Sequence, residues 1–565
     1  MAALALLAAF GVPLLMAALL TLAGARVMVW RLMPFAAVPA LALALLAPMS
    51  LPVPVTVRLD WLILGAQFGL DAVARVFLGL TAVLWVAAGA AARHWLHDDP
   101  QSTGFGICFL LAMAGNLGLI LAQDALSFYS LFAVMSFAAF GLVVHTRSKA
   151  AIGAARLYIV FVIAGELALF AGLALAAGQA ETILLSELRI APMSDLAAAL
   201  LIIGFATKLG LMPLHFWLPP AHGAAPVPAS AVLSGAMIKA GLFGMMATLP
   251  LGIQAFEAIA TVIMAVGLFS IFAAALTGVQ QTNAKAVLGF SSVSQMGIIA
   301  LGLGAALMEP RAWPVILPVL VFQATHHAMS KGALFLGAGA WAAQPGRRGR
   351  ILLTGAVLLP ALVLAGVPHG SGAQGKEALK TALADGPAVW LPWLTVGLSL
   401  SGIATTLLMA RFAVFLWRSP PAVPPGARRE GLVLPFLSLV AVCVALPVLW
   451  PALVPDMGEP VTGAGQGAVW PVLTGVALAA AASLYAHTMA VGVAAFVQQV
   501  TAPFMMMGAR VARVGTRWRR VLRQTAQTVP AVLEGRGIGW RLGQSAIVLL
   551  IVLVLIMEAL ALWVA

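Results

Sequence analysis

Most lysines in this chain lie where a charged side chain is costly. The chain has seven lysines, and six of them fall within or at the edge of long apolar runs: Lys208, Lys239, Lys285, Lys331, Lys376 and Lys380. The arginines lie mostly in the polar segments between those runs. Arginine keeps its proton at any accessible pH, whereas a buried lysine can release it. A lysine held inside a membrane is therefore a candidate proton carrier.

Two histidines and two glutamates join the lysines as candidates for a proton relay. They are His326, His327, Glu166 and Glu377. Gln323, His327 and Lys331 follow one another at steps of four, so a helix would place all three on one face. Two of the lysines, Lys285 and Lys380, lie near the ends of their segments. For these two, the alternative is that the side chain snorkels to the lipid headgroups.

Two segments rich in proline or glycine interrupt the apolar runs beside these lysines. The first, residues 208–228, holds the predicted helix-breaking residues Pro213, Pro219 and Pro220. The second, residues 366–380, holds Gly370, Gly372 and Gly375. This second segment also fits the start of a phosphate-binding loop, but Glu377 stands where that loop needs Ser or Thr. Paired discontinuous helices are typical of a transport path, so the sequence predicts two structural repeats.

The composition excludes several classes of protein. Hydrophobic residues make up 62% of the 565 positions and charged residues only 9%, against about 25% in soluble domains. A cytosolic enzyme, a secreted disulfide scaffold and a disordered protein are therefore excluded. The two cysteines, Cys108 and Cys443, stand in no metal-binding spacing. We find no motif for flavin, haem, nickel or nucleotide, so neither a cofactor nor a metal is expected.

The apolar runs predict the fold class and its orientation. Runs of about 20 apolar residues, the length that crosses a bilayer core, occur roughly 15 or 16 times. The sequence therefore predicts an all-α, multi-spanning membrane protein of the bacterial inner-membrane type. Counting the spans alternately from an outer N-terminus places most loop arginines inside, with both termini on the outer side.

The net charge of +13 is concentrated near the end of the chain. Eight arginines lie between Arg510 and Arg541, and the only acid among them is Glu534. A basic stretch before a final apolar run is typical of the cytoplasmic membrane surface, so nucleic-acid binding is not expected. Residues 498–543 are predicted to form a short amphipathic surface helix that contacts lipid headgroups or a neighbouring subunit. The alternative is a solvated linker that only orients the final span.

Three stretches resemble the signatures of a known family. They are TKLGLMPLHFWLPPAHGAAPVPASAVLSGAMIKAG at 207–241, NAKAVLGFSSVSQMG at 283–297 and HHAMSKGALFLGAG at 326–339. They are similar to the antiporter-like, proton-conducting membrane subunits of respiratory complex I and of Mrp antiporters. The first stretch looks most like the large membrane subunit of hydrogenase-4 and formate hydrogenlyase. The resemblance covers residues 100–420 and implies two inverted five-helix repeats, each with one discontinuous helix.

The resemblance also implies roles for the ionisable residues. Lys208 matches the lysine on the first broken helix, and Lys239 matches the lysine of the following span. His327 and Lys331 match the histidine and lysine of the helix that connects the repeats. Lys376 matches the lysine or glutamate on the second broken helix. In the family, these residues carry protons between two half-channels.

One departure from the family pattern affects the first half of this relay. The family places a glutamate near the positions that Ala133 and Val134 occupy here, and no Asp or Glu lies between Asp124 and Glu166. That glutamate normally pairs with the lysine matched by Lys208. Either Glu166 on the next span takes its place, or the first half is not a standard proton channel.

The predicted division of the chain follows from these features. It comprises accessory spans at 1–100, a first antiporter-like repeat at 101–250, a second at 251–420, C-terminal spans at 421–497, the basic arm at 498–543 and a final transmembrane helix at 544–565.

The sequence and the resemblance together predict a proton-translocating membrane subunit of a redox-driven, complex I-related pump. Its partners would be other membrane subunits and a soluble hydrogenase or other redox module. The alternatives are an Mrp-type Na⁺/H⁺ antiporter subunit, and a gradient-coupling subunit of an inorganic-carbon accumulation complex. Neither alternative requires a redox partner.

Overall fold

The computed structural model describes residues 2–47, 56–62, 65–384, 386–455, 457, 461 and 467–484. The predicted basic arm at 498–543 and the predicted final span at 544–565 lie outside these residues. Within them the α-helices are α1 (Ala2–Leu19), α2 (Arg26–Leu32), α3 (Val38–Leu46), α4 (Ala72–Trp95), α5 (Ser102–Leu121), α6 (Ala125–Val144), α7 (Lys149–Ala180), α8 (Leu185–Leu188), α9 (Asp195–Leu209), α10 (Leu218–Ala224), α11 (Val227–Val232), α12 (Lys239–Thr248), α13 (Glu257–Gly278), α14 (Ala284–Met308), α15 (Trp313–Ala342), α16 (Arg347–Ala365), α17 (Ser371–Ala382), α18 (Leu391–Arg418), α19 (Glu430–Leu453) and α21 (Trp470–Leu484).

The predicted all-α membrane fold is confirmed. Twelve helical segments in the described ranges are long and apolar enough to cross a membrane. Two shorter apolar helices, at Ala3–Leu19 and Trp470–Ser483, correspond to two further predicted runs. The helix α15 is 30 residues long, but polar and ionisable residues lie in its middle section, so it is not one of the twelve. It corresponds to a third further predicted run. The sequence pattern therefore locates the spans closely.

Capping side chains set where several of the long helices begin. Asp71 accepts a hydrogen bond from the Ala74 N–H at the start of α4, and Asp124 accepts one from Ser127 at the start of α6. Ser148 at α7, Ser194 at α9 and Asn283 at α14 cap their helices in the same way. A short polar side chain at this position satisfies a backbone N–H that has no partner within the helix.

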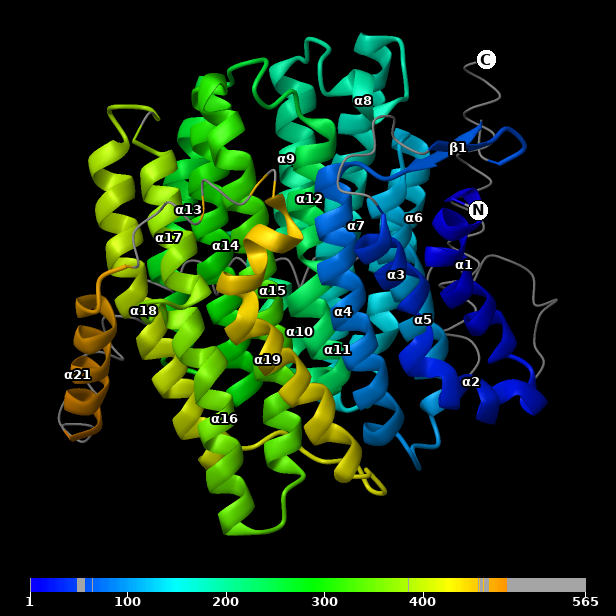
Figure 1. The fold of residues 1–565 in the computed structure, drawn as a ribbon, viewed down its shortest axis with the longest axis vertical. Helices are drawn as coiled ribbons and strands as arrows, with labels where there is room; N and C mark the ends of the chain where they lie inside the picture. The colour runs from blue at the N-terminus through cyan, green and yellow to red at the C-terminus, as the bar shows by residue number, and fades with distance from the viewer. Residues whose placement is uncertain are drawn as a thin grey trace, which may run out of the picture.

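The long helices run side by side between two ends of one bundle (Figure 1). The connections α4–α5, α6–α7, α15–α16 and α18–α19 lie at one end. The helix α8 and a two-stranded antiparallel hairpin, β1 (Thr56–Leu59) with β2 (Ala66–Gly69), lie at the other. The middle of the bundle holds α12 and α14, and the most apolar stretch of each is buried throughout. Ionisable residues on these helices are therefore far from the lipid-facing surface.

The first discontinuous helix ends before Pro213, and the other two predicted helix-breaking prolines lie in the helix that follows. The helix α9 ends at Leu209, where Gly210 adopts a left-handed φ of +80°, and the Met212–Pro213 peptide bond is cis. A 3₁₀ turn, Leu214–Trp217, leads into α10. Pro219 and Pro220 lie in the first turn of α10, where a missing N–H costs nothing. These two prolines therefore begin a helix instead of ending one.

The second break also lies slightly ahead of the predicted glycines. The helix α16 ends at Gly366, which has a φ of +97°, and Gly370 is the residue before α17. Gly372 and Gly375 lie inside α17, not in the break. They allow close approach: a Cβ on Gly372 would overlap the Val363 carbonyl oxygen, and one on Gly375 would overlap Oε1 of Gln323.

Candidate functional site

Glu166 and Lys208 line the same small cavity between α6, α7 and α9. The cavity holds about 10 Å³, and both side chains are buried. Lys208 Nζ donates a hydrogen bond of 2.9 Å to the Ser136 hydroxyl. The backbone carbonyl of Ser136 accepts a hydrogen bond of 2.8 Å from the Tyr158 hydroxyl. The structure thus brings together the acid and the lysine that the sequence offered as a substitute pair.

The charge environment of this pair is sparse. Both carboxylate oxygens of Glu166 are buried without a hydrogen-bond partner. The Lys208 ammonium lies 5.6 Å from the centre of the Phe132 ring and 5.9 Å from that of Tyr158. The two charges interact electrostatically, since the neighbouring cation favours the carboxylate. No ion pair within 4 Å links Glu166 to Lys208 in the structure, but the Ser136 hydroxyl acts on both groups.

Lys239 and His327 make direct contact in the middle of the bundle. Lys239 Nζ lies 2.5 Å from His327 Nδ1 and donates a bond of 2.6 Å to the Ser234 carbonyl. Ser234 belongs to a π-helical turn, Leu233–Met237, a local irregularity that frequently marks functional sites. The Ser234 hydroxyl lies 2.8 Å from that of Ser292 on α14. These contacts bring α12, α14 and α15 together in one buried polar cluster.

Lys331 and Lys285 are anchored by backbone carbonyl groups. Lys331 Nζ donates to the Leu288 carbonyl at 2.8 Å and also to the Ser291 hydroxyl. Lys285 Nζ donates at 2.5 Å to the carbonyl of Ala225, where α10 turns back into α11. Lys285 is therefore turned into the protein, and the snorkelling alternative does not describe it.

His222 belongs to this cluster, although sequence reasoning gave it no role. Its side chain is fully buried and stacked on Phe335, with ring centroids 4.7 Å apart. Neither ring nitrogen has a hydrogen-bond partner. Its electrostatic neighbours are three buried lysines: Lys331, Lys285 and Lys239. The PPAH motif at positions 219–222 was the signal that could have identified His222. We use the name lysine row for the buried residues Lys208, Lys239, Lys285, Lys331, Lys376, His222, His326 and His327.

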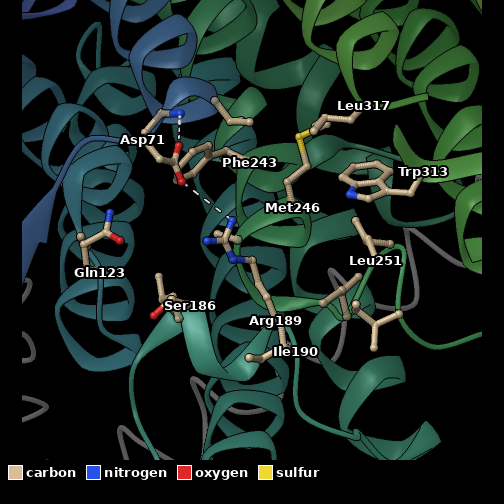
Figure 2. Close-up of a pocket in the computed structure, with 17 residues that line it drawn as sticks. Asp71, Gln123, Ser186, Arg189, Ile190, Phe243, Met246, Leu251, Trp313 and Leu317 are labelled. Carbon is tan, nitrogen blue, oxygen red and sulfur yellow. Dashed lines mark hydrogen bonds and ion pairs between the residues drawn. The ribbon is translucent and has the colours of Figure 1, made fainter. Parts of the chain in front are cut away.

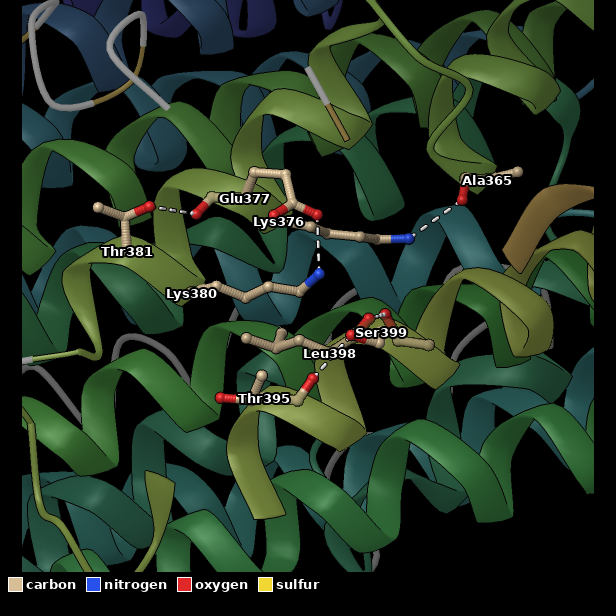
Figure 3. Close-up of polar contacts among 9 residues, drawn as sticks. Ala365, Lys376, Glu377, Lys380, Thr381, Thr395, Leu398 and Ser399 are labelled. Atoms are coloured by element: carbon tan, nitrogen blue, oxygen red, sulfur yellow. Dashed lines mark hydrogen bonds and ion pairs between the residues drawn. The ribbon is translucent and has the colours of Figure 1, made fainter. Parts of the chain in front are cut away.

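The second break brings another histidine and lysine together. His326 Nδ1 lies 2.8 Å from the Ser371 hydroxyl at the start of α17. Lys376 Nζ donates at 3.1 Å to the Ala365 carbonyl, which the end of α16 leaves without a helical partner. Figure 3 shows this contact beside the ion pair of Lys380 with Glu377, at 2.7 Å. Adjacent positions on α15 thus direct His326 to the second break and His327 to Lys239.

Gln323 and Lys331 share the α14-facing side of α15, as their spacing predicts. Gln323 Nε2 donates to Gln295 Oε1 at 3.4 Å, and Gln295 donates to Thr405 on α18 at 2.9 Å. His327, from the same predicted set, contacts α12 instead. The row therefore branches at α15 toward three neighbouring helices.

A separate cavity of about 240 Å³ lies at the end of the bundle that carries α8 (Figure 2). Asp71 and Arg189 form an ion pair of 3.8 Å across it, and both side chains are partly exposed. Asp71 is already the cap of α4, so this pair ties α8 to α4. The cavity lies at one bundle end and holds no member of the lysine row.

Comparison with known proteins gives relatives of two kinds. Hydrogenase-4 component B of Escherichia coli is 32% identical over 258 residues, which are 43% of this chain and 38% of the relative. Na(+)/H(+) antiporter subunit A1 of Staphylococcus haemolyticus is 30% identical over 412 residues, 66% of this chain and 51% of the relative. The chain thus spans about half, or less, of the length of these curated relatives.

Solved structures share the fold. A chain of the Mrp complex from Dietzia sp. DQ12-45-1b has a TM-score of 0.73 at 22% identity, over 99% of this chain and 63% of that chain. A chain of the membrane-bound sulfane sulfur reductase, an archaeal respiratory membrane complex, has a TM-score of 0.67 at 20% identity, over 84% of this chain and 99% of that chain. Residues 122–360 match the transmembrane region of the NADH:quinone oxidoreductase/Mrp antiporter family. The predicted resemblance to that family is confirmed over residues 122–360 of this chain.

Proposed function

We propose that this chain is the proton-translocating membrane subunit of a complex I-related, redox-driven ion pump. The contact between Lys239 and His327 carries the proposal, because it joins two proton-binding groups in the buried middle of the bundle. Lys331 and His222 act electrostatically on His327, and Lys285 in turn acts on His222. Like charges in one buried network repel, so a proton gained at one site changes the affinity for a proton at the next.

The lysine row requires neighbours that supply protons and energy. We propose other membrane subunits of a complex I-like assembly as direct partners and a soluble hydrogenase or other redox module as the source of energy. The relative named hydrogenase-4 component B supports this choice. The orientation that we propose places the α15–α16 connection, with Arg347, Arg348 and Arg350, on the inner side of a bacterial inner membrane.

An Mrp-type Na⁺/H⁺ antiporter subunit is the second candidate. The Staphylococcus haemolyticus relative named Na(+)/H(+) antiporter subunit A1 supports it, as the similarity extends over 412 residues. The two candidates differ in the role of Na⁺. A redox-driven proton pump acidifies vesicles without Na⁺ when its electron donor is present, whereas an antiporter needs an opposing Na⁺ gradient.

The test uses inverted membrane vesicles that contain the complete complex, and a fluorescent dye reports the pH gradient. Lys239→Ala and His327→Ala are each expected to lower the initial rate about tenfold or more, because each removes a proton-transfer group. Lys149→Ala, which changes an exposed lysine at the start of α7, is the matched control and should transport normally. Wild-type rates in both test variants would refute the proposed relay, and a strict need for Na⁺ would favour the second candidate.

A further inference from the structure

Two connections, α4–α5 and α18–α19, meet at the bundle end that we propose as cytoplasmic (Figure 1). The Arg428 N–H donates at 2.8 Å to the carbonyl of His94 in the last turn of α4. A Cβ on Gly431 would overlap the His94 ring, and one on Gly426 would overlap the Asp98 carboxylate. Gly426 also has a φ of +75°, which favours glycine. We call this set of contacts the loop seam, and it holds the end of α4 against the start of α19.

His94 is the titratable group at the centre of the loop seam. Its ring is half-buried, and its Nδ1 is buried without a hydrogen-bond partner. The groups that act on it electrostatically are Arg93, Arg428 and His97, and all of them are bases. Of the ion pairs in the described part of the chain, none includes His94. A proton on His94 therefore adds a positive charge beside two arginines.

The acids of these connections and of the adjoining helix turns either have other partners or face solvent. They are Asp98, which pairs with His97 at 2.5 Å, Asp99, which pairs with His145 at 3.0 Å, and Glu430, which is exposed. None of the three is among the groups that act on His94. The charge of a protonated His94 would thus be uncompensated.

The loop seam joins two helices that pack beside Lys331. Gly332, the next residue on α15, lies against both of them. A Cβ there would overlap Leu84 of α4 and would lie 3.0 Å from Leu439 of α19. The loop seam is the contact between these two helices at their cytoplasmic end, so its opening would loosen the packing on Gly332.

We propose that the loop seam is a pH-dependent latch, which protonation of His94 opens. Neutral His94 packs on Gly431 and leaves the seam closed. Protonated His94 is repelled by Arg93 and Arg428, and its buried Nδ1–H has no acceptor. The closed seam therefore binds the proton less well than the open seam, and acidification of the cytoplasmic side favours the open seam. The consequence for Lys331 rests on the proposed function, but the latch itself does not.

The test is hydrogen–deuterium exchange of the full chain in lipid nanodiscs at about pH 7.5 and about pH 5.5, on either side of the usual histidine range. Each rate is divided by the intrinsic rate of an unprotected amide at the same pH. In the wild type, peptides that contain Arg428 should lose protection about tenfold or more at the lower pH, because the Arg428 N–H is released when the seam opens. His94→Phe and His94→Gln should keep their protection at both pH values, since neither new side chain takes up a proton.

Arg428→Gln tests the repulsion separately. This variant keeps the backbone N–H that bonds to the His94 carbonyl but removes one of the two arginine charges that act on the ring. Its loss of protection at the lower pH should therefore be smaller than in the wild type.

His145→Phe is the matched control. His145 is a buried histidine at the same bundle end, and its ring packs on Phe105 with centroids 5.1 Å apart, outside the loop seam. This variant should respond to pH like the wild type.

Any of three results would refute the latch. Equal protection of the Arg428 peptides at both pH values would show that the seam does not open. An equal loss in the wild type and in both His94 variants would assign the titration to another group. An equal loss in peptides from the α6–α7 and α15–α16 connections would indicate general unfolding of that bundle end. All of these measurements are structural, so their failure leaves the proposed function untouched, and a failed transport test leaves the latch untouched.

Discussion

Four of the buried lysines are held by backbone carbonyls rather than by carboxylates. Lys239, Lys285, Lys331 and Lys376 donate to the carbonyls of Ser234, Ala225, Leu288 and Ala365, respectively. A carbonyl accepts a hydrogen bond from both the charged and the neutral amine, so the side chain keeps its place in either state. A carboxylate partner would instead favour the charged amine. This arrangement suits the proton transfer that we propose for these lysines. Lys208 is the exception, because it donates to the Ser136 hydroxyl and has Glu166 as a neighbour.

That exception leads to a prediction about coupling. Glu166→Gln should lower proton transport about as much as Lys208→Ala, by about tenfold or more, because both disable one proton-transfer step. The double variant should be little worse than either single one, as for residues of one network. Transport rates in vesicles measure all three. If the rate losses of the two single variants multiply in the double variant, Glu166 and Lys208 act independently. The first half of the relay would then need another acid.

His222 allows a test in which packing is largely retained. His222→Phe keeps an aromatic ring against Phe335 and removes no hydrogen bond that the structure shows. The protein should therefore assemble normally while its proton transport falls about tenfold, since a proton-binding group among three lysines is lost. Thermal unfolding in detergent and the transport rate are measured on the same preparation. Normal transport with normal stability would make His222 a packing residue.

At the scale of elements, the second break packs closely against its neighbours at glycines, which have no side chain. Gly372 packs on the Val363 carbonyl at the end of α16, and Gly375 packs on Gln323 of α15. Backbone atoms cannot move aside as a flexible side chain can. The position of α17 relative to α16, and with it that of Lys376, therefore depends on Gly372, whereas the Gln323 side chain beside Gly375 can move aside.

Gly372→Ala should push α17 away from α16 and destabilise the protein by about 1–3 kcal/mol through overpacking. Gly355→Ala is the matched control: it lies in α16, and a Cβ there would meet nothing within 4 Å. Because alanine favours helix over glycine, the control should be neutral or slightly stabilising. Midpoints of thermal unfolding in detergent compare the two. Equal midpoints would show that α17 tolerates displacement at this contact.

At the scale of the whole molecule, the bundle ends differ in their connections. The α4–α5, α6–α7 and α15–α16 connections share one end, while α8 and the β-hairpin share the other. The basic residues of Arg347–Arg350 lie at the first end, which we propose as the cytoplasmic end on the positive-inside pattern.

Cysteine labelling tests the assignment. With Cys108 and Cys443 replaced by alanine, Ser186→Cys and Ser419→Cys each place one exposed thiol at an opposite end. A membrane-impermeant maleimide added to intact cells should label the thiol at 186 and leave the thiol at 419 unreacted. In inverted vesicles the result should reverse. The opposite result would invert the orientation and contradict the loop-charge argument.

The sequence by itself determined the spans, their approximate limits and most of the buried ionisable residues, but not His222. Apolar runs and loop arginines are local features. Backbone polar groups must be paired within the membrane, and runs of about 20 apolar residues fit helices, since a β-barrel strand needs only about 9–11 residues. The sequence also indicated both breaks. It placed the second one slightly late, because glycine is needed both where a helix ends and where two helices touch, and Gly372 serves the second purpose.

Only the tertiary structure decided which of these groups meet. Lys239 contacts His327 across 88 positions, and Arg411 contacts Gln281 across 130. His222 became a member of the row only when packing placed it among lysines from three other helices. Helical spacing predicts which side of its own helix a residue occupies. The residue that it contacts on that side depends on how all the helices pack. Partners, cavities and the branching at α15 follow from that packing, which no local pattern encodes.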